Sequence, residues 1–383
     1  MRIAFYAPLK PPTHPVPSGD RRMALSLMEA MRQSGHIVEL ACRFRSYDGG
    51  GNAARQARLC RIGQGLAARL LNRYEAGEPE RRPQLWFTYH LYHRAPDWLG
   101  PAISRGLDIP YIAAEASFAG KQEGGRWAAG HRAAAAAIEA ADMIVNFNPI
   151  DAAGVRRLHG DDRRMIALPP FIEAAPFQAA ASRHRDRRDA IGKRFDLASD
   201  PPRFLTVAMM RPGDKLESFR LLGLALRQLL DLPWQLLVIG EGPARAIVEE
   251  YLSGLGPDRV RFGGEQPQEA MPDIYAGCDL YVWPAIGEAY GMSFLEAQAA
   301  GLPAIAGDNH GVGEVVDGKA GALVPAGDVD AFAAALRRLA TAPREWPERR
   351  AAAQAFVANR RSLAAARAVL DAAMARAVAR RRR

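Results

Sequence analysis

Short apolar runs and longer amphipathic segments alternate along nearly the whole chain. Apolar runs of about four to eight residues bounded by glycine or proline are typical of buried strands, and the longer segments are typical of helices. The pattern predicts strands over residues 2–7, 36–41, 84–88, 109–114, 141–146, 203–208, 235–239, 260–263, 280–283, 304–306 and 321–324. It predicts helices over residues 20–34, 55–76, 126–140, 266–276 and 292–300, with others beginning near residues 149, 216 and 328. Such alternation favours an α/β fold with parallel sheets that are covered by helices on both faces.

The length of the chain and one interruption of the pattern predict two domains. A chain of 383 residues exceeds one ordinary hydrophobic core. Residues 173–200 lack periodicity and are rich in Arg, Asp and Ala, so we expect a linker there. An N-terminal domain then covers residues 1–172 and a second domain residues 201–358, and residues 359–383 follow as a C-terminal helix.

The stretch from residue 280 to residue 306 carries the clearest candidate chemistry. A strand ends at Pro284, a loop follows, and a helix begins near Met292. A helix N-terminus at the carboxyl end of a parallel strand offers unpaired N–H groups and a positive dipole end to an anion. Glu288 in the loop and Glu296 inside the helix would frame that anion site. Alternatively, Ser293 and Glu296 form a capping box, and Glu288 is a solvated loop charge.

This stretch resembles the signature of retaining nucleotide-sugar glycosyltransferases, specifically glycosyltransferase family 4. The resemblance rests on Pro284, on Glu288 and Glu296 with seven residues between them, on Gly291 before the helix, and on residues 301–305 (GLPAI) after it. It implies that Glu288 contacts the donor sugar and that Glu296 hydrogen-bonds the ribose of the nucleotide. It also places the main-chain amides of the loop and helix start beside the donor; these belong to Tyr290, Gly291, Met292 and Ser293.

Two cations in the loop after the strand at residues 203–208 extend the resemblance. Arg211 and Lys215 stand where the family has an arginine and, four residues on, a lysine that hold the donor diphosphate. Such groups would stabilise the charge that grows on a departing diphosphate, so Arg211 and Lys215 join Glu288 as the expected catalytic residues. Gly19, before the first helix, would bring the backbone close to the same diphosphate. Two exposed loop cations and an ordinary turn glycine are the plainer alternatives.

The acceptor side departs from the family pattern. Many members carry a histidine, facing the sugar, at the end of the strand that here ends at Glu115. We therefore expect Glu115, and His131 in the following helix, on the acceptor side. His90 and His93 are further candidates, and a structural role for any of these histidines is an equally open alternative.

The composition indicates what the reaction needs. The sequence contains no Asp-x-Asp run to hold a divalent ion, so we expect no metal and no cofactor beyond the nucleoside diphosphate sugar as co-substrate. Three widely spaced cysteines support neither a disulfide framework nor a zinc site. No apolar run reaches the ~18–20 residues of a membrane span, and the chain opens in a strand rather than a signal peptide. A cytoplasmic location is expected.

The charge leaves two interpretations of the C-terminus open. The net charge is +9, with arginine clusters over residues 183–188, 344–361 and 380–383. Such a balance suits phosphate-bearing substrates, an anionic membrane or nucleic acid, although a coding bias toward arginine explains it equally well, and nucleic-acid binding would rest on the charge alone. The C-terminal helix carries an apolar stripe, formed by Leu363, Leu370, Met374 and Val378. The resemblance implies a fold of the GT-B type, in which a C-terminal helix commonly returns to the N-terminal domain. The apolar stripe suits such packing. Alternatively, the terminal arginines hold the chain on the inner membrane face.

The resemblance as a whole implies the GT-B arrangement, with two doubly wound Rossmann-like domains facing across a cleft, an acceptor-side domain first and a donor domain second. The predicted activity is hexosyl transfer from a nucleoside diphosphate sugar to an acceptor hydroxyl with retained configuration. The expected setting is envelope or exopolysaccharide synthesis with a glycan or lipid-linked acceptor, without nucleic acid. The alternatives are a sugar-nucleotide epimerase or hydrolase of similar fold and a non-catalytic nucleotide-sugar-binding protein.

Overall fold

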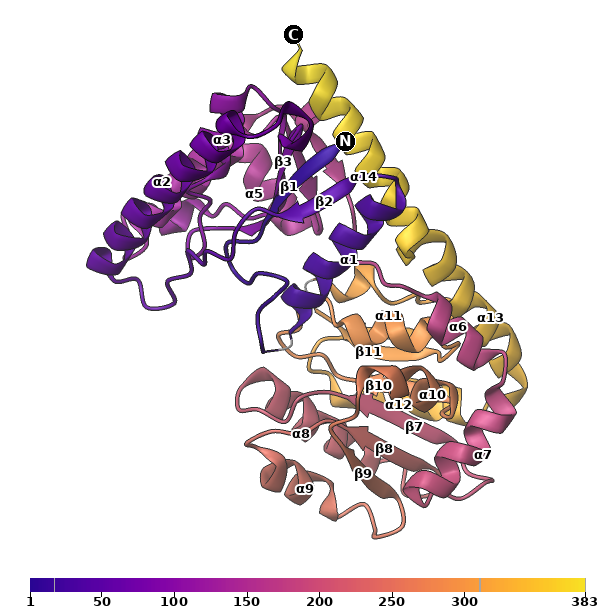
Figure 1. Ribbon diagram of the computed structural model, residues 1–383. Helices are drawn as coiled ribbons and strands as arrows, with labels where there is room; N and C mark the ends of the chain where they lie inside the picture. Colours follow the sequence, from indigo (N-terminus) through magenta and orange to yellow (C-terminus); the bar gives the residue numbers. More distant parts are fainter. Residues whose placement is uncertain (17, 310, 383) are drawn as a thin grey trace. The chain divides into compact units, whose positions relative to one another are not determined.

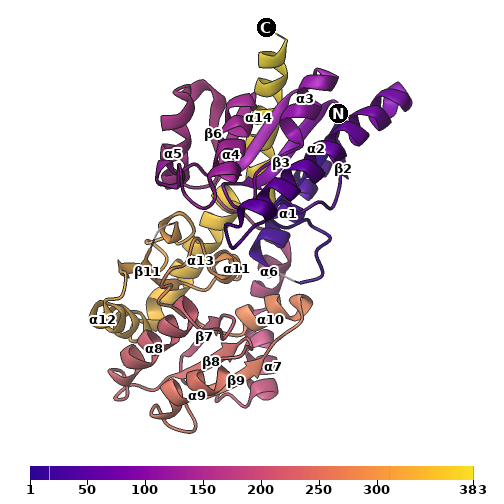
Figure 2. The same cartoon turned by 90° about the vertical axis from the view of Figure 1, so that its left-hand side faces the viewer.

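The computed structural model describes all residues except 17, 310 and 383, and the side chain of residue 159 is also left undescribed. The chain forms two units, coloured along the sequence in Figures 1 and 2. Unit 1 comprises Met1–Pro169 and Leu363–Arg383, and unit 2 comprises Pro170–Ser362. Each predicted strand overlaps an observed one. No helix in the described part of the chain has both the length and the apolarity to cross a bilayer.

Unit 1 is built on a six-stranded sheet in the order β2-β1-β3-β4-β5-β6, and every neighbouring pair is parallel. Its strands are β1 (Arg2–Tyr6), β2 (Ile37–Leu40), β3 (Leu85–Leu91), β4 (Tyr111–Ala116), β5 (Met143–Asn146) and β6 (Met165–Ala167). Its helices are α1 (Gly19–Gln33), α2 (Ala53–Ala76), α3 (Gly100–Leu107), α4 (Ala128–Ala140), α5 (Pro149–His159) and α14 (Leu363–Arg381). Helices α1 and α14 pack together (Figure 1), and α14 also contacts β4, β5 and β6; α2 packs against α3 and α4.

Unit 2 has a second parallel six-stranded sheet, in the order β12-β11-β10-β7-β8-β9. Its strands are β7 (Arg203–Val207), β8 (Gln235–Ile239), β9 (Val260–Gly264), β10 (Leu280–Trp283), β11 (Ala304–Asp308) and β12 (Ala322–Pro325). Its helices are α6 (Ala175–Ala181), α7 (His184–Phe195), α8 (Asp214–Arg227), α9 (Arg245–Ser253), α10 (Met271–Ala276), α11 (Met292–Ala299), α12 (Val329–Ala340) and α13 (Trp346–Phe356). The central strands are buried on both faces, as their continuous apolar runs predict.

The predicted linker over residues 173–200 is wrong, because this segment forms α6 and α7 inside unit 2. Phe177 and Ile191 are buried, and both helices pack against α10. Few other apolar residues occur here, so the segment shows little helical periodicity. Polar contacts also hold it in place.

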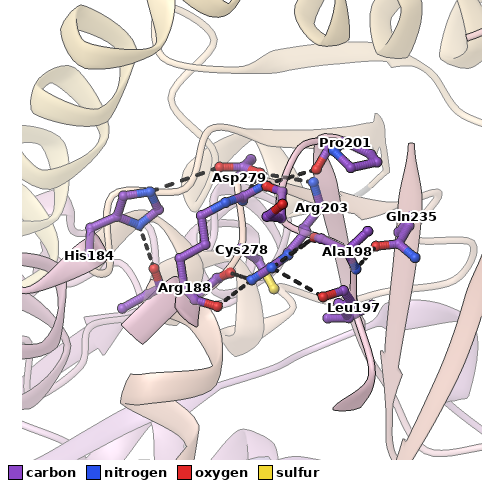
Figure 3. A network of polar contacts seen from close by, with 12 residues as sticks. His184, Arg188, Leu197, Ala198, Pro201, Arg203, Gln235, Cys278 and Asp279 are labelled. Atoms are coloured by element: carbon purple, nitrogen blue, oxygen red, sulfur yellow. Dashed lines mark hydrogen bonds and ion pairs between the residues drawn. The ribbon is translucent and has the colours of Figure 1, made fainter. Parts of the chain in front are cut away.

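A network of polar contacts, drawn in Figure 3, provides much of that attachment. The Asp279 carboxylate is buried, forms an ion pair with Arg188 of α7, and accepts a hydrogen bond from the backbone N–H of Arg203 at 2.8 Å. The Arg203 side chain, itself buried, donates to the carbonyl of Ala198 at 2.8 Å. Arg350 of α13 donates to the other Asp279 oxygen at 3.0 Å. One carboxylate therefore joins α7 and α13 to the starts of β7 and β10.

The C-terminal helix begins at residue 363 instead of 359, because Val357–Arg361 forms a π-helix that belongs to unit 2. In the apolar stripe Leu363, Leu370 and Met374 are buried against unit 1, whereas Val378 is half-buried and Ala377 is buried in its place. Of the terminal arginines, Arg380 lies 3.1 Å from Asp161 and Arg381 lies 3.0 Å from Asp108. These two cations are paired with carboxylates of their own unit. Arg383 lies outside the described residues.

Candidate functional site

The strand order of unit 2 marks where a ligand site belongs. In open parallel sheets, ligands bind beyond the carboxyl ends of the strands where the direction of the connections reverses. In unit 2 that point lies between β7, the first strand of its sheet, and its neighbour β10. The loop after β7 leads to Lys215, and the loop after β10 leads to Glu288. The topology therefore brings the two predicted segments to one edge.

Tight backbone contacts hold the loop after β7 in place. The N–H of Met210 donates to the carbonyl of Glu241 at 2.9 Å, and the N–H of Ala244 donates to the carbonyl of Met210 at 2.9 Å. Gly242 lies so close to Met210 that any Cβ there would collide with its carbonyl oxygen. Arg211 comes next and is exposed, and its side chain makes no hydrogen bond or ion pair with the described residues. The backbone is fixed while the guanidinium stays available to a ligand.

The loop after β10 is strained and is held by a buried hydroxyl. Ala285 has a φ of 61°, a left-handed conformation that costs free energy for a residue with a side chain. The adjacent N–H of Ile286 donates to Ser218 Oγ at 2.9 Å, and that hydroxyl donates to the carbonyl of Asp214 at 2.9 Å. Ser218 is fully buried. It therefore connects the loop to the first turn of α8.

Lys215 and Glu288 meet at this edge as an ion pair. Their side chains are 19 % and 17 % exposed, so the pair is neither fully solvated nor sealed. Lys215 Nζ also lies 5.3 Å from the ring centroid of Trp283, the buried last residue of β10, which is a cation–π distance. The structure thus brings together the residue predicted to hold the diphosphate and the one predicted to contact the sugar.

The helix start at α11 differs from the capping box that the sequence allows. Gly291, at φ 72°, precedes the first helical residue, Met292, and no side chain caps the helix. Ser293 lies inside the helix, where its Oγ accepts a hydrogen bond from the Tyr281 hydroxyl at 2.7 Å. Burial raises the pKa of Tyr281, which keeps that hydroxyl protonated. The amides of Met292 and Ser293 at the start of α11 are therefore free of side-chain caps and can face an anion.

Glu296 is buried, and its carboxylate accepts a hydrogen bond from the Tyr275 hydroxyl at 2.8 Å. It does not cap the helix. Tyr290, beside the helix start, is half-buried and lies against Gly311.

Unit 1 has its own topological switch, between β1 and β3. Helix α1 begins there at Gly19, which is exposed and has open space around its Cα. Asp20 Oδ1 lies 3.1 Å from Nδ1 of His90, near the end of β3, and the same nitrogen lies 3.8 Å from Glu115 Oε2 on β4. His90 and Glu115 have φ values of 60° and 50°, both in the left-handed region. Two strained residues are thus turned toward one helix start.

Charge interactions shift the acid–base behaviour of this cluster. Burial by itself lowers the pKa of His90, but the charge of Glu115 and the hydrogen bond and charge of Asp20 raise it to about 9. Burial raises the pKa of Glu115, and His90 offsets part of that effect. For Asp20 burial opposes ionisation, yet the contacts with His90 lower the pKa overall. His90 is therefore an imidazolium at neutral pH, flanked by two carboxylates.

The sequence prediction named Glu115 but did not anticipate Asp20. The signal was an aspartate directly after Gly19, at the start of the first helix. The other acceptor-side candidate, His131, is buried on α4; its ring stacks on Phe118 at 4.7 Å and its Nε2 lies 3.1 Å from the carbonyl of Ala119. These contacts are those of a packing residue. Among the described residues, no group of three or more His, Cys, Asp or Glu side chains is arranged to hold a metal ion.

The fold is a two-domain α/β fold, and the switch point of its second sheet carries the candidate anion site. Residues 201–342 match the family described as Glycosyl transferases group 1. They therefore form a group 1 glycosyltransferase domain, which confirms the predicted kinship.

The D-inositol 3-phosphate glycosyltransferase of Rhodococcus erythropolis is 36 % identical over 135 residues, 33 % of this chain and 30 % of that protein. The protein of the same name from Mycolicibacterium smegmatis is 27 % identical over 205 residues, 51 % of this chain and 44 % of that protein. The chain thus aligns with less than half the length of either relative.

Solved structures share the fold over nearly the whole chain. The crystal structure of a glycosyltransferase from Rickettsia africae has a TM-score of 0.75 at 15 % identity, with 98 % of each chain covered. The structure of HepE from Anabaena in complex with UDP has a TM-score of 0.70 at 14 % identity, covering 98 % of this chain and 100 % of that one. The predicted α/β fold of the GT-B type is confirmed.

Proposed function

We propose that this chain transfers a sugar from a nucleoside diphosphate sugar to an acceptor hydroxyl, as a hexosyltransferase that retains the anomeric configuration. The observation that carries the proposal is the pairing of Lys215 with Glu288 at the switch point of unit 2. A cation suited to phosphate and a carboxylate suited to sugar hydroxyls stand side by side there. A donor carries the two matching groups side by side, because its sugar is bonded to its diphosphate.

The expected chemistry is stabilisation of the leaving group. As the bond between sugar and diphosphate breaks, negative charge grows on the diphosphate, and fixed donors aimed at that charge lower the barrier. Lys215 supplies a compact ammonium, Arg211 a forked guanidinium, and the start of α11 its free amides. Glu288 orients hydroxyls of the sugar, and Glu296 takes the ribose. With these cations available, we propose that no divalent metal is needed.

The acceptor side is assigned to unit 1. The carboxylates of Asp20 and Glu115 are suited to hydroxyl groups, and the His90 imidazolium between them fixes their orientation. Gly19 at the start of α1 has open space around it, and its approach to the donor diphosphate stays a prediction. We propose a glycan or lipid-linked acceptor in envelope or exopolysaccharide synthesis, and His131 serves only the packing of this unit.

Thermal shift measurements with nucleotide sugars test the donor assignment. A ligand that binds only the folded state stabilises it by about 2.7 kcal/mol at a hundred times its Kd. UDP-, GDP- and ADP-sugars form the screen, because one similar protein is named as GDP-mannose-dependent and two similar solved structures contain UDP-glucose or ADP. One nucleotide class should raise the melting temperature, and the Lys215→Ala variant should lose most of that rise. If no nucleotide sugar shifts either protein, the donor assignment fails.

A second assay separates the alternatives. A transferase releases nucleoside diphosphate only when an acceptor is present, and NMR of the product shows the configuration of the new bond. Release from donor alone indicates a hydrolase or epimerase. Binding without turnover for any acceptor tried indicates a nucleotide-sugar-binding protein.

A further inference from the structure

Helix α2 of unit 1 carries a row of basic side chains along one exposed face. Arg55, Arg58, Ile62, Arg69 and Arg73 follow one another at spacings of three, four, seven and four residues. At 3.6 residues per turn these spacings keep all five on one narrow stripe, which we call the α2 basic face. The helix has 24 residues, a length of about 36 Å. Its opposite side packs against α3 and α4 (Figure 1).

The charge of this face is largely unneutralised. Arg58, Arg69 and Arg73 form no ion pair with any described residue, and Arg55, which lies 3.8 Å from Asp48, is still 60 % exposed. The only acidic residue in the helix is Glu75, in its last turn. The terminal arginines of α14 are different, because Arg380 and Arg381 are already paired within unit 1.

Apolar side chains lie among these arginines. Ile62 is 39 % exposed, and Leu59 and Leu66, on the same side of the helix, are half-buried. At the helix start the side chains of this face border one open hollow; they are Asn52, Ala54, Arg55, Arg58, Leu59 and Ile62. A helix with cations flanking an exposed apolar strip matches the chemistry of an anionic lipid surface, where the cations meet headgroups and the apolar side chains enter the boundary.

We propose that the α2 basic face docks unit 1 on an anionic lipid bilayer. A bilayer accounts for Ile62 and its leucine neighbours as well as for the arginines. A nucleic acid would use the charge alone, because no aromatic side chain lies on this face for stacking on bases. The proposal is independent of the donor site, so it can hold or fail whatever the enzyme transfers.

Vesicle sedimentation of the full chain tests the docking. Vesicles of phosphatidylcholine are compared with vesicles containing about one third phosphatidylglycerol, at 50 mM and at 300 mM NaCl. Binding should require the anionic lipid and fall steeply at the higher salt. Each basic residue near such a surface contributes about 1 kcal/mol, so the Arg58→Gln/Arg69→Gln variant should bind about 30-fold more weakly.

A matched control removes the same charge elsewhere. Arg338 and Arg344 of unit 2 are exposed and form no ion pair with described residues, so Arg338→Gln/Arg344→Gln should bind vesicles like the wild type. Ile62→Ser should weaken vesicle binding but leave retention on heparin unchanged, since heparin offers charge without an apolar phase. The inference is overturned if the wild-type chain does not bind anionic vesicles at 50 mM NaCl, or if both double variants weaken vesicle binding equally. Tight binding of a DNA duplex without vesicle binding would also overturn it.

Discussion

The ion pair between Lys215 and Glu288 leads to an unusual expectation: removing the charge of Glu288 should tighten the binding of a bare nucleoside diphosphate. Lys215 is already engaged by the Glu288 carboxylate, with about four fifths of each side chain covered. Unit charges about 4 Å apart attract by about 4 kcal/mol at the effective dielectric constant of ~20 found near protein surfaces. Desolvation cancels much of this gross value, and a hydrogen bond to a charged group contributes about 1.5–3 kcal/mol net.

When a ligand phosphate draws Lys215 away from Glu288, its binding must offset the free energy of that ion pair. With Glu288→Gln the amide still accepts a hydrogen bond, but the competing charge is gone. We expect a three- to tenfold lower Kd for the diphosphate, about 0.7–1.4 kcal/mol. Turnover with the full donor should fall at least tenfold, at least about 1.4 kcal/mol in barrier, because the contact with the reacting sugar is lost.

Isothermal titration with the nucleoside diphosphate and a transfer assay at saturating donor measure the two effects. Glu217→Gln is the control. Glu217 lies in the first turn of α8, as Lys215 does, but it pairs with Arg220. It should change neither affinity nor rate by more than about twofold, as expected of an exposed pair. The reasoning is refuted if Glu288→Gln weakens diphosphate binding, or if more than about a third of the turnover survives, a barrier change below ~0.7 kcal/mol.

Three further outcomes are expected. Arg211→Ala and Lys215→Ala should each weaken nucleoside diphosphate binding by about 1.5–3 kcal/mol, whereas Glu296→Ala should also weaken the bare nucleoside; unchanged calorimetric affinities in all three would exclude a donor in unit 2. Activity should survive excess chelator, and loss with recovery on adding magnesium or manganese would contradict the proposed handling of the leaving group. His90 has a folded pKa of about 9 against 6.5 unfolded, so its stabilisation is complete below pH 6.5 and is lost as the pH rises through 9. Urea unfolding at pH 6 and pH 10 should therefore show a stability loss of up to about 3 kcal/mol that is absent in His90→Gln, and equal losses in both proteins would refute the ion cluster.

The sequence was sufficient for elements whose stability comes from apolar burial. Strands β7 and β10 and helix α11 follow from apolar runs and from glycine and proline at their ends. The segment over residues 173–200 could not be assigned in this way, because Arg188 attaches it to Asp279, a residue far along the chain. Contacts between distant polar residues leave no periodic signal.

The candidate site shows the same division. Arg211, Lys215 and Glu288 follow from local patterns after strands, and the parallel topology brings their loops together. Asp20 and Glu115 meet at His90 from three separate segments, and the left-handed backbone that turns Glu115 has no signature in a residue other than glycine.

The connection from the π-helix to α14 has a consequence for the order in which the chain can fold during synthesis. Unit 2 is one continuous segment, Pro170–Ser362, whereas unit 1 is assembled from both ends of the sequence. The ribosome therefore completes the second unit before it delivers the helix that covers β4, β5 and β6 of the first. Until residue 363 and those after it emerge, the buried partners of Leu370 and Met374 stay open to water and to other chains. The unit that is made first is thus the last to be finished.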